Sequence, residues 1–249
     1  MTRLLLVNPN TSDSVSALIR AEALRSADPG TEIEVLTAPF GVAYIETRFE
    51  AMIGAYATAQ LAGEHLGNYD ALVVAVFGDP GLTGLREALP VPVTGMTEAA
   101  LASAHLLGHR ISIIAISQRI QAWYREVVES YGFGSRLASI RALDRPLASI
   151  GQVQDDHTQA LKALAERAVD EDGADVIVLA GAPLAGLARA LQGQLPVPVV
   201  DGVSSAVRHA QSLVALRPGT HLRGSFAPPP PKPHQGLPAG IARLLDRNR

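Results

Sequence analysis

Short apolar runs alternate with amphipathic stretches along most of this chain of 249 residues. The runs are rich in Val, Ile and Leu and nearly free of polar residues, which is typical of parallel strands buried on both faces of a sheet. The stretches between them repeat apolar positions at helical spacing, as at Val15, Leu18 and Ile19. This alternation predicts an α/β protein with mainly parallel sheets flanked by helices.

The same pattern gives approximate limits for each element. The predicted strands cover residues 4–7, 33–36, 71–76, 91–93, 111–116, 176–179 and 197–200. The predicted helices cover residues 13–25, 49–66, 82–89, 97–107, 119–131, 153–171, 184–191 and 204–213. Beyond them, residues 227–233 form a proline-rich segment that predicts an extended polyproline II strap. A last amphipathic turn follows this strap and is expected to dock on the body of the protein; a ligand for a proline-recognition module is the alternative interpretation.

An internal duplication is the most informative feature of the chain. Residues 90–93 read Pro-Val-Pro-Val, and residues 196–199 repeat this tetrapeptide. The strands that begin at Leu4 and Ile111 are separated by nearly the same number of residues, which chance similarity of turns would not produce. We therefore expect two similar lobes related by a pseudo-twofold axis, with the site in the cleft between them. Lobe 1 would comprise residues 1–100 with 208–249, and lobe 2 residues 101–207.

Composition and charge narrow the range of functions. The chain has 21 Lys and Arg against 24 Asp and Glu, 4% aromatic residues, and no Cys. This balance argues against a nucleic-acid partner or an anionic membrane surface, and no apolar run approaches the roughly 18–20 residues that span a bilayer. A chain without Cys has no disulfide, no thiolate nucleophile and no Cys-ligated metal. The His and acidic residues show no ligand spacing, so we expect no metal site, and we expect a cytoplasmic protein.

Four loops follow predicted strands, two in each lobe, at residues 8–11, 77–81, 117–118 and 181–183. Ligands of open parallel sheets bind outside the carboxyl ends of the strands. Helix N-termini and backbone amides in these loops would donate hydrogen bonds to an anion or a carbonyl oxygen. We therefore expect a small carboxylate- or amide-bearing ligand held between two half-sites. None of the loops carries an ATP or dinucleotide fingerprint, and no cofactor is expected.

Three motifs resemble those of the hydantoin racemases. They read Val-Asn-Pro-Asn-Thr-Ser at residues 7–12, Phe-Gly-Asp-Pro-Gly-Leu at residues 77–82, and Gly-Met-Thr-Glu-Ala-Ala at residues 95–100. The hydantoin racemases belong to the aspartate/glutamate racemase superfamily, with allantoin racemases and arylmalonate decarboxylases as relatives. The resemblance covers nearly the whole chain in the right order. It implies two α/β lobes around one site, cofactor-independent chemistry on a carbon acid next to a carbonyl, and a homo-oligomer.

The chain departs from this family at its two catalytic cysteines. In the family, one thiol removes the α-proton and the other returns a proton to the opposite face. The resemblance places these thiols at Val76 and Gly181, and neither residue can transfer a proton. Two-thiol racemisation is therefore excluded. The remaining interpretations are a racemase-like enzyme with another proton carrier, a lyase or decarboxylase that works without Cys, and a catalytically silent protein that binds the same small molecules.

Asp79, Tyr44 and Ser117 are the candidates for catalytic groups in place of the thiols. Asp79 is the ionisable residue closest in sequence to Val76, and a raised pKa would make it a base, although capping of the turn that follows is the competing interpretation. The resemblance places Tyr44 over the substrate, as a proton donor or a packing residue. It places Ser117 at an oxyanion-binding position, with helix capping as the alternative.

Further side chains and backbone groups of the four loops are expected to contact the ligand. They are Asn8, Thr11, Phe40, Val76, Phe77, Gly78, Gln118, Gly181, Ala182 and Pro183. By contrast, Trp123 and Tyr124 lie in the predicted helix over residues 119–131, and we expect them to pack in the core or between the lobes.

Overall fold

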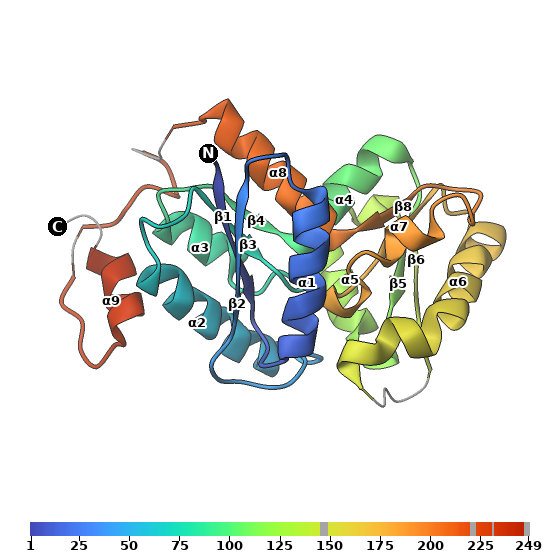
Figure 1. Ribbon diagram of the computed structural model, residues 1–249, viewed down its shortest axis with the longest axis horizontal. Coiled ribbons are helices and arrows are strands. Elements are labelled where there is room, and N and C mark those ends of the chain that lie inside the picture. Colours follow the sequence, from blue (N-terminus) through green and yellow to red (C-terminus); the bar gives the residue numbers. More distant parts are fainter. Residues whose placement is uncertain (145–148, 220–222, 231, 247–249) are drawn as a thin grey trace.

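The computed structural model describes residues 1–144, 149–219, 223–230 and 232–246. They form two α/β lobes, each built on a four-stranded parallel sheet, as the sequence predicts (Figure 1). The sheet of lobe 1 contains β1 (Arg3–Asn8), β2 (Glu32–Thr37), β3 (Ala71–Val74) and β4 (Val93–Gly95). The sheet of lobe 2 contains β5 (Ile111–Ala115), β6 (Leu137–Ala142), β7 (Val176–Leu179) and β8 (Val199–Asp201).

Helices follow most of the strands, as the alternating pattern predicts. The α-helices are α1 (Asp13–Ser26), α2 (Arg48–Glu64), α3 (Leu82–Ala88), α4 (Met96–Leu107), α5 (Gln121–Ser130), α6 (Val153–Asp172), α7 (Leu187–Leu191), α8 (Gly202–Leu216) and α9 (Ala239–Asp246). Short 3₁₀ turns are η1 (Gln118–Ile120), η2 (Gly134–Arg136), η3 (Ile150–Gln152) and η4 (Ala182–Leu184).

The two sheets repeat one topology. Their strand orders are β2-β1-β3-β4 and β6-β5-β7-β8, so each strand of lobe 1 has a counterpart at the same place in lobe 2. The pairing registers match as well, because Leu4 of β1 lies opposite Ala71, and Ile111 of β5 lies opposite Val176. The duplication seen in the sequence is therefore a duplication of structure. The lobe limits at residues 100 and 207 stay a prediction.

The last helix of each repeat packs on the sheet of the other lobe. Helix α4 follows β4 but contacts β7 and β8, whereas α8 follows β8 but contacts β3 and β4. The two helices also contact each other, and α8 lies beside α1 in the middle of the molecule (Figure 1). Gly202 of α8 lies tightly against α4, because a Cβ there would lie only 2.8 Å from the Cβ of Met96. This exchange of helices joins the lobes, and both hydrophobic clusters of the core contain residues from each lobe.

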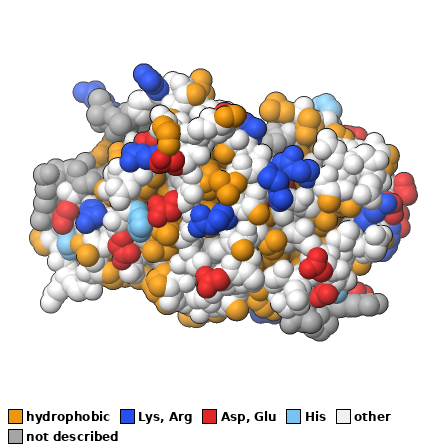
Figure 2. All heavy atoms as spheres, viewed as in Figure 1, with side chains coloured by type: hydrophobic (Ala, Val, Ile, Leu, Met, Phe, Trp, Pro, Cys, Tyr) orange, Lys and Arg blue, Asp and Glu red, His pale blue; other side chains and the backbone are white. Residues whose placement is uncertain are grey.

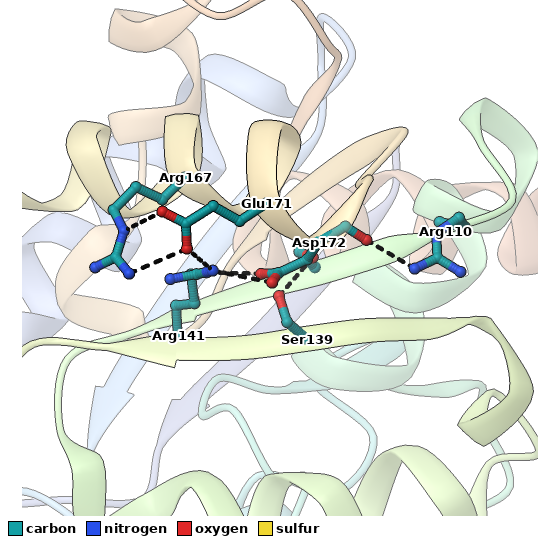
Figure 3. Close-up of polar contacts among 7 residues, drawn as sticks. Arg110, Ser139, Arg141, Arg167, Glu171 and Asp172 are labelled. Carbon is teal, nitrogen blue, oxygen red and sulfur yellow. Dashed lines mark hydrogen bonds and ion pairs between the residues drawn. The ribbon is translucent and has the colours of Figure 1, made fainter.

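Strand β6 is absent from the sequence predictions, and it is an edge strand. Its apolar residues alternate with Ser139 and Arg141, which an edge strand tolerates because one side of it faces away from the sheet. The Arg141 guanidinium donates hydrogen bonds of 2.6 Å to Asp172 and to Glu171 at the end of α6, as Figure 3 shows. Arg167 donates to Glu171 from the same helix. Charge pairing thus holds the edge strand against α6.

The chain ends in a segment that returns to lobe 1. Helix α9 packs on α2 so closely that a Cβ at Gly63 would lie 2.0 Å from the carbonyl oxygen of Gly240. Arg243 donates to the carbonyl of Glu64 at 2.9 Å, which caps the end of α2. The expected docking of the last amphipathic turn is therefore confirmed. The proline-rich segment contains residue 231, which lies outside the described residues.

The charge on the surface and the length of the helices limit the kinds of partner that the described residues can bind. On the face drawn in Figure 2, Lys and Arg side chains lie in separate groups among acidic and hydrophobic ones, so this face carries no continuous basic surface in the described part of the chain. Among the described residues, the helices are all too short or too polar to cross a lipid bilayer.

Candidate active site

The loops after β3 and β7 occupy equivalent places in the two lobes, and each contains a position at which the sequence resemblance predicts Cys. Val76 follows β3 and is 8% exposed, and Gly181 follows β7 and is also buried. Gly181 has a φ of +114°, a conformation that favours glycine. A Cβ built there would lie 3.5 Å from Pro183, which is ordinary contact. Position 181 therefore has space for a side chain but a backbone that disfavours one.

These two loops hold backbone N–H groups without partners. Val76, Phe77, Gly181 and Ala182 are buried, and their amides donate to none of the residues that the structure describes. The amides on either side are satisfied: Ala75 and Ala180 donate to the adjacent strands, and Gly78 donates to the hydroxyl of Thr97. Buried residues whose amides lack acceptors are rare in folded proteins, so these four N–H groups are candidates for binding ligand oxygens. Two come from each lobe, and the hypothesis that they form two halves of one site stays a prediction.

The loop after β1 offers a further free donor, and it is not on the residue that sequence reasoning selected. The side chain of Asn8 is buried, and its Nδ2 donates to Asn10 Oδ1 and Ser16 Oγ, both at 3.0 Å. Asn10 Oδ1 also accepts from the backbone N–H of Ser12 at 2.9 Å, which fixes the orientation of this amide. Its Nδ2 then has no acceptor among the described residues, although Asn10 is only 4% exposed. Asn10 is therefore a candidate ligand donor, and Asn8 holds it in place.

Asp79 is fully engaged by its surroundings. Its carboxylate accepts from the backbone N–H groups of Thr97 at 2.9 Å and Glu98 at 2.8 Å, and from the Tyr131 hydroxyl at 3.0 Å. Burial raises the pKa of Asp79 to about 6, against the lowering effect of these donors. The carboxylate thus caps α4 rather than its own turn. The first N–H groups of α4 are therefore occupied by this side chain and are not free to bind a ligand.

Tyr124 is a further candidate site residue, which the sequence analysis assigned to packing alone. Its ring does pack, with its centroid 4.7 Å from that of Phe77. Its hydroxyl, however, donates to no described residue. Burial raises the pKa of Tyr124, and the carboxylates of Asp79 and Glu46 raise it further, so the phenol stays protonated. A neutral hydroxyl without a described partner is a candidate hydrogen-bond donor for a ligand. The only sequence signal for it was its position one turn beyond the strand-end loop.

The remaining candidates have mixed roles. Ser117 Oγ accepts from the backbone N–H of Arg119 at 3.3 Å, which is the capping alternative. Gln118 is exposed and donates to the carbonyl oxygen of Ala142 at 2.9 Å, so its amide nitrogen holds the end of β6. Ligand contacts by Ser117 and Gln118 stay predictions.

Phe40 and Tyr44 lie between β2 and α2, and each side chain is more than one third exposed. Burial and the neighbouring Glu46 raise the pKa of Tyr44, so its phenol also stays protonated. Thr11 is exposed, and its backbone N–H donates to the carbonyl of Val42 in this same loop at 3.0 Å. The β1 loop and the loop that carries Tyr44 are therefore joined. Within the described residues, no group of three or more His, Asp or Glu has the geometry to hold a metal ion.

Known proteins resemble this chain in sequence and in structure. The chain is 34% identical over 232 residues to a hydantoin racemase of Paenarthrobacter aurescens. The aligned region covers 92% of this chain and 98% of the relative. It superposes on the allantoin racemase of Klebsiella pneumoniae with a TM-score of 0.91 and 35% identity, over 97% of this chain and 99% of that one. Arylmalonate decarboxylase shares the fold, with a TM-score of 0.62, 17% identity, and coverage of 87% and 96%. The profile of the Asp/Glu/hydantoin racemase family matches residues 4–210, and the chain belongs to this family.

Proposed function

We propose that this chain is a racemase-type enzyme that acts without thiols on a small carbon acid next to a carbonyl group. The substrate class is a hydantoin, a lactam or a carboxylate. Loss of a proton or of a carboxyl group next to a carbonyl leaves an enolate, whose negative charge lies largely on oxygen. The single observation that carries the proposal is the set of buried amides without acceptors at Val76, Phe77, Gly181 and Ala182. Preorganised donors of this kind stabilise an enolate oxygen in a site without water.

The proton must move on a group other than a thiol. Val76 and Gly181 carry no exchangeable side-chain proton, and Asp79 is held by three donors. The phenols of Tyr44 and Tyr124 stay protonated because their pKa values are raised, which makes them acids rather than bases. A site with donors but no evident base suits a lyase or decarboxylase, because C–C cleavage leaves the electron pair without prior deprotonation and needs only one proton afterwards. This second reaction class therefore stands beside isomerisation.

A catalytically silent binding protein is the other candidate function. Replacement of both thiols by Val76 and Gly181 favours it, since the loops then retain the amides that bind a ligand and lack the groups that move protons. A homo-oligomer and a cytoplasmic location stay predictions.

A panel of carbon acids in D₂O separates these functions. The panel contains a 5-substituted hydantoin, a lactam, an α-amino acid and a 2-substituted malonate, each followed by proton NMR with a thermal-shift assay alongside. Isomerisation replaces the α-proton with deuterium, whereas decarboxylation turns the malonate into a deuterated monoacid. Thermal stabilisation without either change supports the binding protein. A panel with no binding and no turnover contradicts both functions.

Thiol restoration tests whether the family's geometry has survived. Val76→Cys/Gly181→Cys is expected to racemise the 5-substituted hydantoin, because two thiols would then follow β3 and β7 in equivalent positions. Val76→Ala/Gly181→Ala is the matched control, since it places a Cβ at the strained position 181 without a thiol. No activity in a folded, ligand-binding Cys variant would show that the loops have diverged from the family.

A further inference from the structure

The carboxylate of Asp79 occupies the volume that a side chain at position 95 would need. Gly95 precedes α4 as its N-cap, and a Cβ built there would lie 2.3 Å from Cγ of Asp79. The first turn of α4 receives its capping oxygens from Asp79 instead, which lies 16 residues earlier in the chain. The glycine at position 95 is not required by the backbone, because its φ of −109° and ψ of 151° suit any residue. It is required by the carboxylate of Asp79.

In lobe 2, the helix that corresponds to α4 is capped by its own N-cap residue. The Pro-Val-Pro-Val segment of this lobe is followed by Asp201 at the position that Gly95 occupies in lobe 1. Asp201 has nearly the same backbone angles, −115° and 158°, and its own carboxylate accepts from the Ser204 N–H at 2.9 Å. The counterpart of Asp79 in the loop after β7 is Leu184, which caps nothing. The capping carboxylate of lobe 1 has therefore moved from the helix itself to the loop after β3.

This displacement ties the loop after β3 to both lobes. Asp79 accepts from α4 and from Tyr131 at the end of α5 in lobe 2. Thr97, one of its donors, accepts in turn from the Gly78 N–H. On the other side of the loop, a Cβ at Gly78 would lie 2.4 Å from the ring of Trp123, so α5 also rests directly on its backbone. Asp79 itself has a φ of +46°, an uncommon conformation for a residue other than glycine.

We propose that Asp79 is a positioning residue, which orients the free amides of Val76 and Phe77 by anchoring their loop to α4 and to Tyr131 at once. A cap placed on position 95, as in lobe 2, would stabilise the helix but leave this loop unanchored. This inference rests on the proposed function only for the role of the amides, which is to bind a ligand oxygen. The anchoring itself can be tested without a ligand. Asp79 touches no substrate in this account and acts through the backbone that follows β3.

The exchange variant Asp79→Gly/Gly95→Asp separates anchoring from capping. Glycine accepts the φ of position 79, and its lack of a side chain frees the space beside position 95. Asp79→Gly alone is expected to lower Tm and to speed hydrogen–deuterium exchange in residues 76–79. The double variant Asp79→Gly/Gly95→Asp is expected to recover at least half of the lost Tm. Hydrogen–deuterium exchange in this loop should still be about tenfold faster than in the unaltered protein. Full recovery of slow exchange, or no recovery of Tm, would overturn the proposal.

Tyr131→Phe is a second variant that leaves α4 capped and adds no glycine. It removes one hydrogen bond to Asp79 and keeps the aromatic ring, so the protein is expected to fold. Faster exchange confined to residues 76–79, with little change in Tm, supports the anchor. Exchange identical to that of the unaltered protein contradicts it. Because neither readout involves ligand or turnover, a failure here is distinct from a failure of the proposed function.

Discussion

Arg189 donates a hydrogen bond of 2.9 Å to Glu22 and so joins α7 of lobe 2 to α1 of lobe 1. The Glu22 side chain is fully buried, and it also accepts from Arg25 at 3.0 Å and from Ser26 at 2.9 Å. A buried carboxylate is stable only when such donors satisfy it. Three donors satisfy this one carboxylate, and one of them comes from the other lobe, so the contact stabilises the arrangement of the two lobes.

Arg189→Ala is expected to lower the free energy of unfolding by about 1 kcal/mol, because Glu22 keeps two donors and the guanidinium is half-exposed. Arg48→Ala is the matched control: Arg48 also bridges the lobes, to Glu126, but both partners are exposed. This control should lose no more than about 0.5 kcal/mol. Urea unfolding measures both, and equal losses would show that burial of Glu22 adds nothing.

Gly78→Ala should be strongly destabilising. Its φ of +107° strains any other residue, and the new Cβ would overlap the Trp123 ring. We expect a loss of about 2–4 kcal/mol in urea unfolding. Gly84→Ala is the control, since nothing lies within 4 Å of a Cβ there and the helix α3 gains propensity. It should gain up to about 1 kcal/mol, and a similar loss at both positions would contradict the steric argument.

The pH dependence of stability should carry a contribution from Asp79. Its pKa is about 6 in the folded protein and near the ordinary 3.8 in the unfolded chain. Between these values the folded protein binds a proton that the unfolded chain has released, so this contribution grows as pH falls from above 6 towards 3.8. In urea unfolding, the free energy of unfolding of the unaltered protein should rise by about 2 kcal/mol relative to that of Asp79→Asn as the pH falls from 8 to 4. A constant difference would mean that the pKa is not raised.

The ion network at β6 should act in the opposite direction. Hydrogen bonds from Arg167 and Arg141 lower the pKa of Glu171 to about 2, from an ordinary 4.5. A lowered pKa adds stability that is complete above about pH 5 and is lost as pH falls towards 2. Arg141→Met should therefore unfold more easily in urea at pH 7 and approach the unaltered protein near pH 2. An equal deficit at both pH values would point to lost packing in place of lost charge.

Asn10→Asp tests the free amide at the end of β1. The substitution keeps the Oδ1 acceptor for Ser12 and replaces the unpartnered Nδ2 donor with an oxygen. The new carboxylate is buried but keeps the donors from Asn8 and Ser12, so we expect a loss of about 1 kcal/mol in stability. Affinity for a 5-substituted hydantoin, measured by calorimetry, should fall at least tenfold. Asn8→Asp is the contrasting variant, because its Nδ2 is used inside the protein, and it should lose about 2 kcal/mol of stability. Undiminished affinity of Asn10→Asp would remove Asn10 from the site.

The amino-acid sequence by itself determined the two α/β lobes, their duplication and the absence of thiols at positions 76 and 181. Periodicity, repeated tetrapeptides and residue identity are local properties, so they can be read without coordinates. It also predicts a site on the loops after β1, β3, β5 and β7, because parallel strands present their carboxyl ends at one edge of the sheet. The edge strand β6 escaped prediction because Ser139 and Arg141 interrupt its apolar residues.

Only the tertiary structure decided which groups in those loops are free. Asn8 and Asn10 have the same side chain, yet one amide is satisfied by Ser16 and the other is not. Gly95 and Asp79 belong together because a carboxylate fills the space of an absent Cβ, and Tyr124 pairs its ring but not its hydroxyl. Each of these outcomes depends on contacts between distant segments. Hydrogen-bond satisfaction is a property of packed neighbours, and a linear sequence does not record which neighbours a residue will have.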